Sequence, residues 1–270
     1  MRMIVIPRLG GPEVLTMIEV EQPTPRPDEV LIKLRFAGLT YGDIYQREGT
    51  YRKGALLKES EAPLRIGGEG AGTVAMVGAN VTHLKEGDDV VYCECLGSYA
   101  EYAAVPAWRV VKIPTGIRFQ DAAAVFSLGG TAHYLAHDTG KLRPGLSCLI
   151  HAGAGGLGHL LIQFAKMLGA SVLTTVGNEA KARFRHHMRT RDEISRRAEG
   201  ILSAMRDGRL RVAVCRTFPL SKPVRLTVSS SRGRRLARFF CRSLERSRRF
   251  GFQQRSEAAG FLRQNQFNPP

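Results

Sequence analysis

Apolar residues recur with two different periods along the first two thirds of the chain. Up to about residue 118, short β-branched or alternating runs are separated by Gly, Pro, Asn and Asp, which is the pattern of short strands joined by turns. These runs lie at 30–36, 72–77, 89–93 and 99–105. Residues 121–137 instead have a helical spacing, and we expect that helix to break near Gly129-Gly130. The pattern predicts a β-rich first part.

Residues 145–177 predict one strand–helix–strand step. Ser147-Cys-Leu-Ile150 is a short apolar run, residues 157–168 are apolar at helical spacing, and residues 171–176 form a second β-type run. The turn between the first strand and the helix is His151-Ala-Gly-Ala-Gly-Gly-Leu-Gly158. Glycines let the backbone approach a pyrophosphate, and a helix N-terminus offers N–H groups and a positive dipole end. The context predicts a dinucleotide phosphate site, although a bare strand-to-helix turn is the alternative.

The next segment departs from this alternation. A doubly wound nucleotide domain needs several further strand–helix units of about 30 residues each. Here Thr190 and Glu193 form a capping-box pattern for a new helix that ends at Gly208. A strand over 210–214 and a further extended run over 217–220 are expected after it.

The positive charge is concentrated at one end of the chain. The protein has 40 Lys and Arg against 24 Asp and Glu, and residues 183–270 hold 22 of the former and 6 of the latter. Residues 1–182 are therefore neutral overall, with 18 of each sign. From residue 223 onward there are 11 Arg, no Lys and no sustained period, which is typical of a disordered or basic interaction tail.

Cysteine usage and hydropathy indicate a cytosolic protein. The five cysteines show no C-x-x-C spacing, so neither a disulfide framework nor a zinc module is expected. The chain has no apolar run of 18 residues and no secretory signal pattern at its start.

Several motifs resemble the zinc-independent quinone oxidoreductases, the zeta-crystallin-like group of the medium-chain dehydrogenase/reductase superfamily. Besides the glycine-rich turn, the matching stretches occur in the family's order and are Gly11-Pro-Glu-Val-Leu15, Asp43-Ile-Tyr-Gln-Arg47, Gly68-Glu-Gly-Ala-Gly72, Gly97-Ser-Tyr-Ala-Glu-Tyr102 and Thr131-Ala-His-Tyr134.

The resemblance implies an α/β fold in two domains. We expect a GroES-like β-rich catalytic domain over 1–118 and a partial, truncated Rossmann NADPH-binding domain, with a doubly wound parallel sheet, over 119–183. Residues 184–222 would supply the helix and strand that return to the catalytic domain, and 223–270 an Arg-rich tail. The family's remaining nucleotide-domain units are absent between Lys181 and His187. The tail also does not resemble the closing helix and strand with which the family ends. An internal deletion with a shifted reading frame at the end accounts for both departures, and a selected basic tail is the alternative.

The same resemblance implies hydride transfer from NADPH to a quinone or another electron-poor alkene or carbonyl compound. Where zinc-dependent alcohol dehydrogenases place a cysteine and a Gly-His-Glu, this chain has Thr40 and Gly67-Gly68-Glu69. We therefore expect no metal. The cofactor carries the chemistry, and the protein positions the two rings and excludes water.

Four residues are implied for the catalytic side of the site. Tyr45 and Tyr51 match family tyrosines that line the substrate and nicotinamide pocket, and Asp43 matches a family acid near the same place. Thr40 stands where family members often carry Asn, so a hydroxyl would replace a substrate-orienting amide. The alternatives are a loop or helix cap for Asp43 and ordinary half-buried packing for the tyrosines.

The end of the second strand favours NADPH over NADH. An NAD site usually has an acidic residue there, whereas this chain continues Thr175-Val-Gly-Asn178, with Lys181 matching a family ligand of the 2′-phosphate. Glu179 is the counter-evidence, and Lys181 could equally be a solvated helix residue. The cofactor-binding residues implied in this way are Thr131, Ala154, Gly155, Gly156, Leu157, Gly158, Gly177 and Lys181.

Two other functions stay open. The chain could be a catalytically inactive, truncated remnant of the family, because one strand–helix–strand step leaves exposed parallel edges. The Arg- and Phe-containing segment 223–270 could instead bind nucleic acid or an acidic membrane, although it has no known motif. We expect a small-molecule substrate, no membrane partner, and no family-type homodimer, since the strands through which that dimer pairs are missing.

Overall fold

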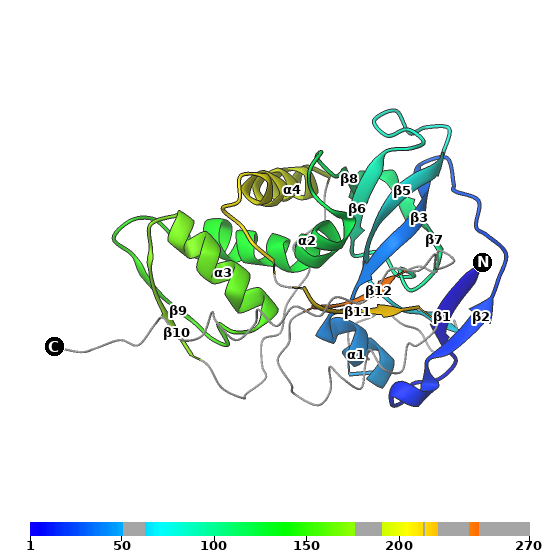
Figure 1. Ribbon diagram of the computed structural model, residues 1–270, viewed down its shortest axis with the longest axis horizontal. Coiled ribbons are helices and arrows are strands. Elements are labelled where there is room, and N and C mark those ends of the chain that lie inside the picture. Colours follow the sequence, from blue (N-terminus) through cyan, green and yellow to red (C-terminus); the bar gives the residue numbers. More distant parts are fainter. Residues whose placement is uncertain (51–62, 176–190, 213, 221–237, 243–270) are drawn as a thin grey trace, which may run out of the picture.

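The computed structural model describes residues 1–50, 63–175, 191–212, 214–220 and 238–242. Most of the strands lie on one side of the molecule, and β9 and β10 form a small sheet on the other side (Figure 1). The helices α2, α3 and α4 lie between the two groups of strands. The strands are β1 (Arg2–Ile6), β2 (Thr16–Glu19), β3 (Glu29–Gly38), β4 (Leu64–Arg65), β5 (Glu69–Val77), β6 (Asp89–Cys93), β7 (Tyr102–Pro106), β8 (Val110–Lys112), β9 (Ser147–Ile150), β10 (Ser171–Thr174), β11 (Val214–Pro219) and β12 (Arg238–Arg242).

The described residues include four α-helices and three short helical turns. A short 3-10 turn precedes β2, another precedes β8, and a π-helical turn extends α2. The α-helices are α1 (Tyr41–Glu48), α2 (Phe119–Tyr134), α3 (Gly156–Met167) and α4 (Arg191–Arg206), and the short turns are Pro12–Val14, Ala107–Arg109 and Leu135–Thr139.

The predicted β-rich part is confirmed as a large sheet built around β3. Among the described residues this sheet has seven strands, in the order β11-β12-β3-β5-β6-β8, with β7 paired to β3 beside that path. Val30, Ile32 and Leu34 alternate along β3 and share one buried cluster with residues of β5, β6 and β7. A second sheet, in the order β2-β1-β4, contains the N-terminal strand β1. The described part of the chain is therefore mixed α/β, with a β-rich first part.

The prediction that the helix breaks at Gly129-Gly130 was wrong. α2 runs without interruption from Phe119 to Tyr134 and continues into the π-helical turn. A Cβ built on Gly129 would lie 3.4 Å from side-chain carbons of Ile201 in α4. This is ordinary van der Waals contact, whereas a Cβ on Gly200 of α4 would lie 2.9 Å from the His133 ring of α2. The two helices thus pack closely, and this packing outweighs the cost of about 1 kcal/mol that a glycine carries in a helix.

The helix predicted to end at Gly208 is confirmed as α4, which ends at Arg206, two residues before Gly208 with its φ of 69°. Its predicted N-cap, Thr190, lies outside the described residues. Ala198, Ile201 and Leu202 are buried on the face that meets α2. The prediction of a strand over 210–214 was wrong. Leu210 packs into the cluster between the helices, and the strand, β11, begins at Val214 instead.

Part of the segment expected to lack regular structure is a strand. Residues 238–242 form β12, which pairs in parallel with β11 and antiparallel with β3 over residues 36–38. The reason is tertiary, because backbone groups of β3 and β11 are available on both sides of a β-prone Arg-Phe-Phe-Cys-Arg run. Most of the segment 223–270 lies outside the described residues.

The predicted strand–helix–strand step is confirmed. β9 and β10 pair in parallel from Ser147↔Ser171 to Ile150↔Thr174. Ile150, Ala165 and Ala170 form a buried cluster between this pair and α3. No helix among the described residues is both long and apolar enough to cross a membrane.

Candidate active site

The turn between β9 and α3 has a backbone that only small residues can adopt. Ala152 has a φ of 54°, in the left-handed region that non-glycine residues rarely occupy. A Cβ built on Gly158 would lie 2.4 Å from the carbonyl oxygen of Ala152. Glycine at 158 therefore allows the first turn of α3 to pack directly on this turn.

The start of α3 presents backbone donors that the helix itself does not use. Gly155 is the N-cap, and the N–H of His159 donates to the Gly155 carbonyl at 2.9 Å, which is a regular bond of the helix. The amides of Gly156, Leu157 and Gly158 come before this bond, so they have no acceptor within the helix. Together with the positive dipole end, they form a group of donors suited to a diphosphate.

The sequence-predicted residues 154–158 therefore lie together at one helix end. Ala154 is exposed at the turn, whereas Gly158 is buried. α2 passes beside the turn, since a Cβ on Gly156 would lie 2.9 Å from Leu128 Cδ1. Thr131 follows Leu128 by less than one helical turn, and its hydroxyl donates to the Ser127 carbonyl at 3.1 Å. Three further predicted residues, Tyr51, Gly177 and Lys181, lie outside the described residues.

Two threonines at the end of β10 hold the turn, and sequence reasoning did not assign them a role. The N–H of Ala152 donates to Thr175 Oγ1 at 3.3 Å, and the N–H of Gly153 donates to the Thr175 carbonyl at 3.0 Å. The Thr174 hydroxyl donates to the Ile150 carbonyl at 2.8 Å. The available signal was their position, because parallel strands joined by a helix bring the end of the second strand beside the turn after the first.

Asp43, which the sequence predicted for the catalytic side of the site, takes part in the N-terminal cap of α1. Its Oδ2 accepts hydrogen bonds from the Thr40 N–H at 2.7 Å, the Thr40 hydroxyl at 3.2 Å and the Tyr99 hydroxyl at 3.3 Å. Thr40 is the N-cap residue and Asp43 occupies the third helical position, which is a capping box. Asp43 is buried, with 3% of its surface exposed. This geometry favours the helix-cap interpretation of Asp43, and it adds Tyr99 as a partner that the sequence pattern did not reveal.

Tyr45 is half-buried on α1 beside Tyr41, with 6.0 Å between the ring centroids. Burial, and secondarily Tyr45, raise the pKa of Tyr41 above its ordinary value. α1 is fixed to the N-terminal loop by Arg47, whose buried guanidinium donates to the Gly10 carbonyl and whose own carbonyl accepts the Gly10 N–H at 3.1 Å. The orientation of Tyr45 is thus set by a rigidly anchored helix.

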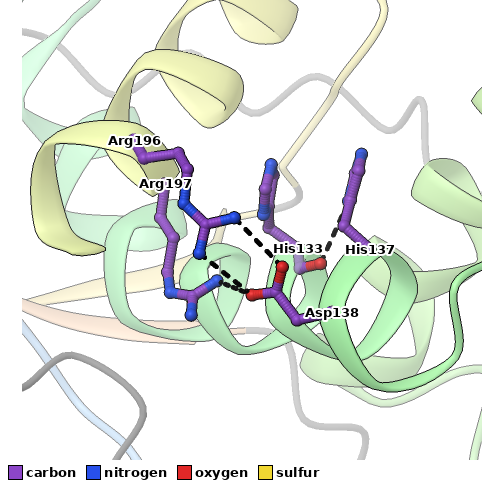
Figure 2. Close-up of polar contacts among 5 residues, drawn as sticks. All are labelled: His133, His137, Asp138, Arg196 and Arg197. Atoms are coloured by element: carbon purple, nitrogen blue, oxygen red, sulfur yellow. Dashed lines mark hydrogen bonds and ion pairs between the residues drawn. The ribbon is translucent and has the colours of Figure 1, made fainter. Parts of the chain in front are cut away.

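A polar cluster joins α2 to α4 away from the glycine turn (Figure 2). Asp138 accepts from Arg196 at 3.0 and 3.3 Å and from Arg197 at 2.6 Å. The rings of His133 and His137 are stacked, with centroids 3.9 Å apart, and His137 Nδ1 lies 3.0 Å from the His133 carbonyl oxygen. Burial, and then the neighbouring His137, lower the pKa of His133 to about 4.

A cavity of about 400 Å³ lies beside this cluster, lined by residues of α2, α3, α4 and the adjoining turns. Phe164, Met167 and Leu168 line it from the C-terminal part of α3. The glycine turn is at the opposite end of that helix, so the cavity is separate from the group of amide donors. Within the part of the chain that the structure describes, no three His, Cys, Asp or Glu side chains lie close enough to hold a metal ion.

The β-rich sheet, the glycine turn and the helix that follows it are a fold that this chain shares with solved quinone oxidoreductases. Residues 26–115 match the family model of the alcohol dehydrogenase GroES-like domain. Beyond this domain the chain is similar in sequence to quinone oxidoreductases, the group that its motifs resemble.

Two curated relatives and one solved structure illustrate the similarity. The chain is 42% identical to a quinone oxidoreductase of Pseudomonas aeruginosa over 175 residues, covering 64% of this chain and 52% of the relative. It is 38% identical to quinone oxidoreductase 1 of Escherichia coli over 174 residues, covering 64% of this chain and 51% of the relative. The crystal structure of E. coli quinone oxidoreductase complexed with NADPH superimposes with a TM-score of 0.81 at 23% identity, covering 90% of this chain and 100% of that one. The chain spans about half the length of the curated relatives it matches.

Proposed function

We propose that this chain binds NADPH at the glycine turn and transfers a hydride to a quinone or another electron-poor alkene or carbonyl compound, without zinc. The observation that carries the proposal is the set of three amides at the start of α3, packed against a turn that only glycine at 158 permits. The names of the relatives and the NADPH in the E. coli structure support the choice of cofactor and substrate class.

In this proposal, Ala154, Gly155, Gly156, Leu157 and Gly158 surround the diphosphate. The amides of the last three residues supply the hydrogen-bond donors, because the Gly155 N–H already donates to the Ala152 carbonyl. Thr131, on α2, would contact the cofactor from the neighbouring helix. Gly177 and Lys181 would bind the adenosine end, with Lys181 on the 2′-phosphate.

On the substrate side, bound NADPH would supply the hydride, and this chain's own residues would orient the acceptor and exclude water. Because the Thr40 hydroxyl donates to Asp43, it offers a substrate a lone pair rather than a proton. Asp43 then serves as a positioning residue that fixes Thr40 and the start of α1. Tyr45 and Tyr51 would line the pocket, and water would supply the protons that a reduced quinone takes up.

The test is the variant Gly158→Ala. Its added methyl group would contact the Ala152 carbonyl, so the turn must shift, and we expect NADPH affinity to fall at least about 10-fold. Gly68→Ala is the matched control, because a Cβ there meets nothing within 4 Å. NADPH fluorescence gives the affinity, and quinone-dependent NADPH oxidation gives the activity. Equal affinities for Gly158→Ala and the wild-type protein would overturn the assignment of the turn.

A second candidate is a catalytically inactive homologue that keeps the β-rich domain. It is favoured by one observation: Leu149 and Leu173, on the face of the β9–β10 pair away from α3, are 58% and 68% exposed among the described residues. A wild-type protein that shows no NADPH binding at millimolar cofactor, with a cooperative unfolding transition intact, would establish this candidate.

A further inference from the structure

We propose that Thr174 and Thr175 are positioning residues that hold the glycine turn in the conformation that binds the cofactor's diphosphate. The inference rests on the proposed NADPH binding and adds two residues to it. Neither threonine belongs to the group of amide donors, and each acts through the backbone of residues 150–153.

Thr175 holds the turn through both its side chain and its main chain. Its Oγ1 accepts from the Ala152 N–H at 3.3 Å and lies 3.1 Å from His151 Nδ1. Its carbonyl accepts from the Gly153 N–H at 3.0 Å, and its N–H donates to the Ile150 carbonyl at 3.1 Å. Four consecutive residues at the end of β9 are therefore tied to a single threonine.

The hydroxyl of Thr175 has the right number of donors and acceptors for this role. Because Oγ1 accepts from the Ala152 N–H, its own proton is available to donate to His151 Nδ1. A valine would have the same shape and make neither bond, whereas a serine would keep both.

Thr174 fixes the turn from a second direction. Its hydroxyl donates to the Ile150 carbonyl at 2.8 Å, which sets the position of Oγ1. A Cβ built on Gly153 would lie 2.0 Å from that oxygen. Gly153 thus packs directly on the Thr174 hydroxyl, and the two positions fit each other.

The turn needs such support because its backbone is strained. Ala152 occupies the left-handed region, which costs about 1 kcal/mol or more for a residue other than glycine. A conformation of this kind persists only where surrounding contacts determine it. The threonine contacts hold the residues on both sides of Ala152, and the amides of Gly156, Leu157 and Gly158 begin four residues further along the chain.

The first experiment compares Thr175→Val with Thr175→Ser in the full chain. We expect Thr175→Val to weaken NADPH binding about 10-fold and raise the KM for NADPH similarly, since two hydrogen bonds are lost. The kcat at saturating NADPH should stay unchanged, because the hydroxyl does not touch the reacting atoms. Thr175→Ser should restore the affinity. Thr16→Val is the matched control, because it also removes a threonine hydroxyl that bonds the backbone, in this case as a donor to the Val14 carbonyl, far along the chain from this turn.

A cofactor-independent measurement separates this inference from the proposed function. Hydrogen exchange at the Ala152 and Gly153 amides should be about 10-fold faster in Thr175→Val than in the wild-type protein without NADPH. Wild-type protein that does not bind NADPH would overturn the proposed function, while the exchange rates would still decide whether Thr175 holds the turn. Unchanged exchange together with unchanged NADPH affinity would overturn the role of Thr175.

The second experiment tests Thr174 by a double-mutant cycle with Gly153. Gly153→Ala alone should lower NADPH affinity at least about 10-fold, because its methyl group meets the Thr174 hydroxyl. In a Thr174→Ala background that oxygen is gone, so the same change should have a clearly smaller effect. Additive effects of the two substitutions would contradict the fit between these positions.

Discussion

The large sheet and the β9–β10 pair differ in how far their apolar side chains are covered. In β3, Val30, Leu31 and Ile32 are fully buried, so both faces of this strand are packed. In the small pair, Leu149 and Leu173 lie directly opposite each other and are 58% and 68% exposed. A two-stranded sheet is marginal by itself. The comparison teaches that the β-rich domain has its own core, whereas β9 and β10 depend on α3 and on the helices packed behind it.

The largest expected effect tests the large sheet. Ile32→Ala removes a fully buried side chain from the centre of β3 and should lower the free energy of unfolding by about 3 kcal/mol. Urea unfolding followed by far-UV circular dichroism measures the change. A loss below about 1 kcal/mol would mean that β3 is not the centre of an independent core.

The next prediction concerns the joint between α2 and α4. Asp138→Asn removes the carboxylate that pairs with Arg197, whose side chain is only 2% exposed, and should cost about 2 kcal/mol. Arg196→Ala is the control. The Arg196 side chain is 56% exposed, so its loss should cost less than about 1 kcal/mol. Equal losses of unfolding free energy for the two variants would show that the pair of Asp138 with Arg197 stabilises the fold no more than the pair of Asp138 with Arg196.

The stacked histidines predict a pH dependence at the same joint. The folded-state pKa of His133 is about 4, below its ordinary value of 6.5, so the unfolded chain binds this proton more readily. The contribution of neutral His133 to the free energy of unfolding should therefore be fully present above pH 6.5. It should fall by about 2 kcal/mol as the pH drops toward 4. His137, Asp138, Arg196 and Arg197 face this ring, and the two arginines oppose its protonation.

The check is to measure the free energy of unfolding between pH 7 and pH 4. His133→Gln should flatten the decline in this range. His159→Gln replaces an exposed histidine of α3 and should leave it as it is. A decline of the same size in all three proteins would assign the pH dependence to other groups.

The smallest expected effect tests the exposed face of the small sheet. Leu173→Ser should change the free energy of unfolding by less than about 0.5 kcal/mol and reduce binding of a hydrophobic dye, because the side chain is largely in water. A loss of more than 1 kcal/mol would show that this face is covered, and it would remove the contrast with β3.

The strand–glycine turn–helix step could be predicted from the sequence because its signals are local. Apolar spacing marked β9 and α3 within one residue of their observed ends, and glycine placed the turn between them. The predictions that failed did so because contacts between distant segments decided the local structure. α2 continues through Gly129 because α4 packs there, β11 begins later because Leu210 is drawn into the core, and β12 forms because two neighbouring strands pair with it.

The residues of the candidate site also fall into two groups, those that a local sequence pattern predicts and those that only tertiary contacts bring to the site. The cluster at 154–158 was predictable, because it is one continuous segment with a motif of its own. The contribution of Tyr99 to Asp43 was not, because 56 residues separate them in the chain. Thr174 and Thr175 looked like ordinary strand residues until the parallel pairing of β9 and β10 placed them beside Ala152 and Gly153.

By itself the sequence determined the similarity to quinone oxidoreductases, strands of the β-rich part and the place of the glycine turn. Each of these depends on short-range spacing and on residues that few backbones accept. The tertiary structure alone decided that Asp43 caps α1, that α2 stays whole, and that two threonines support the turn. These features arise from contacts between segments far apart in the chain, and their free energies come from packing and hydrogen bonds that no local pattern encodes.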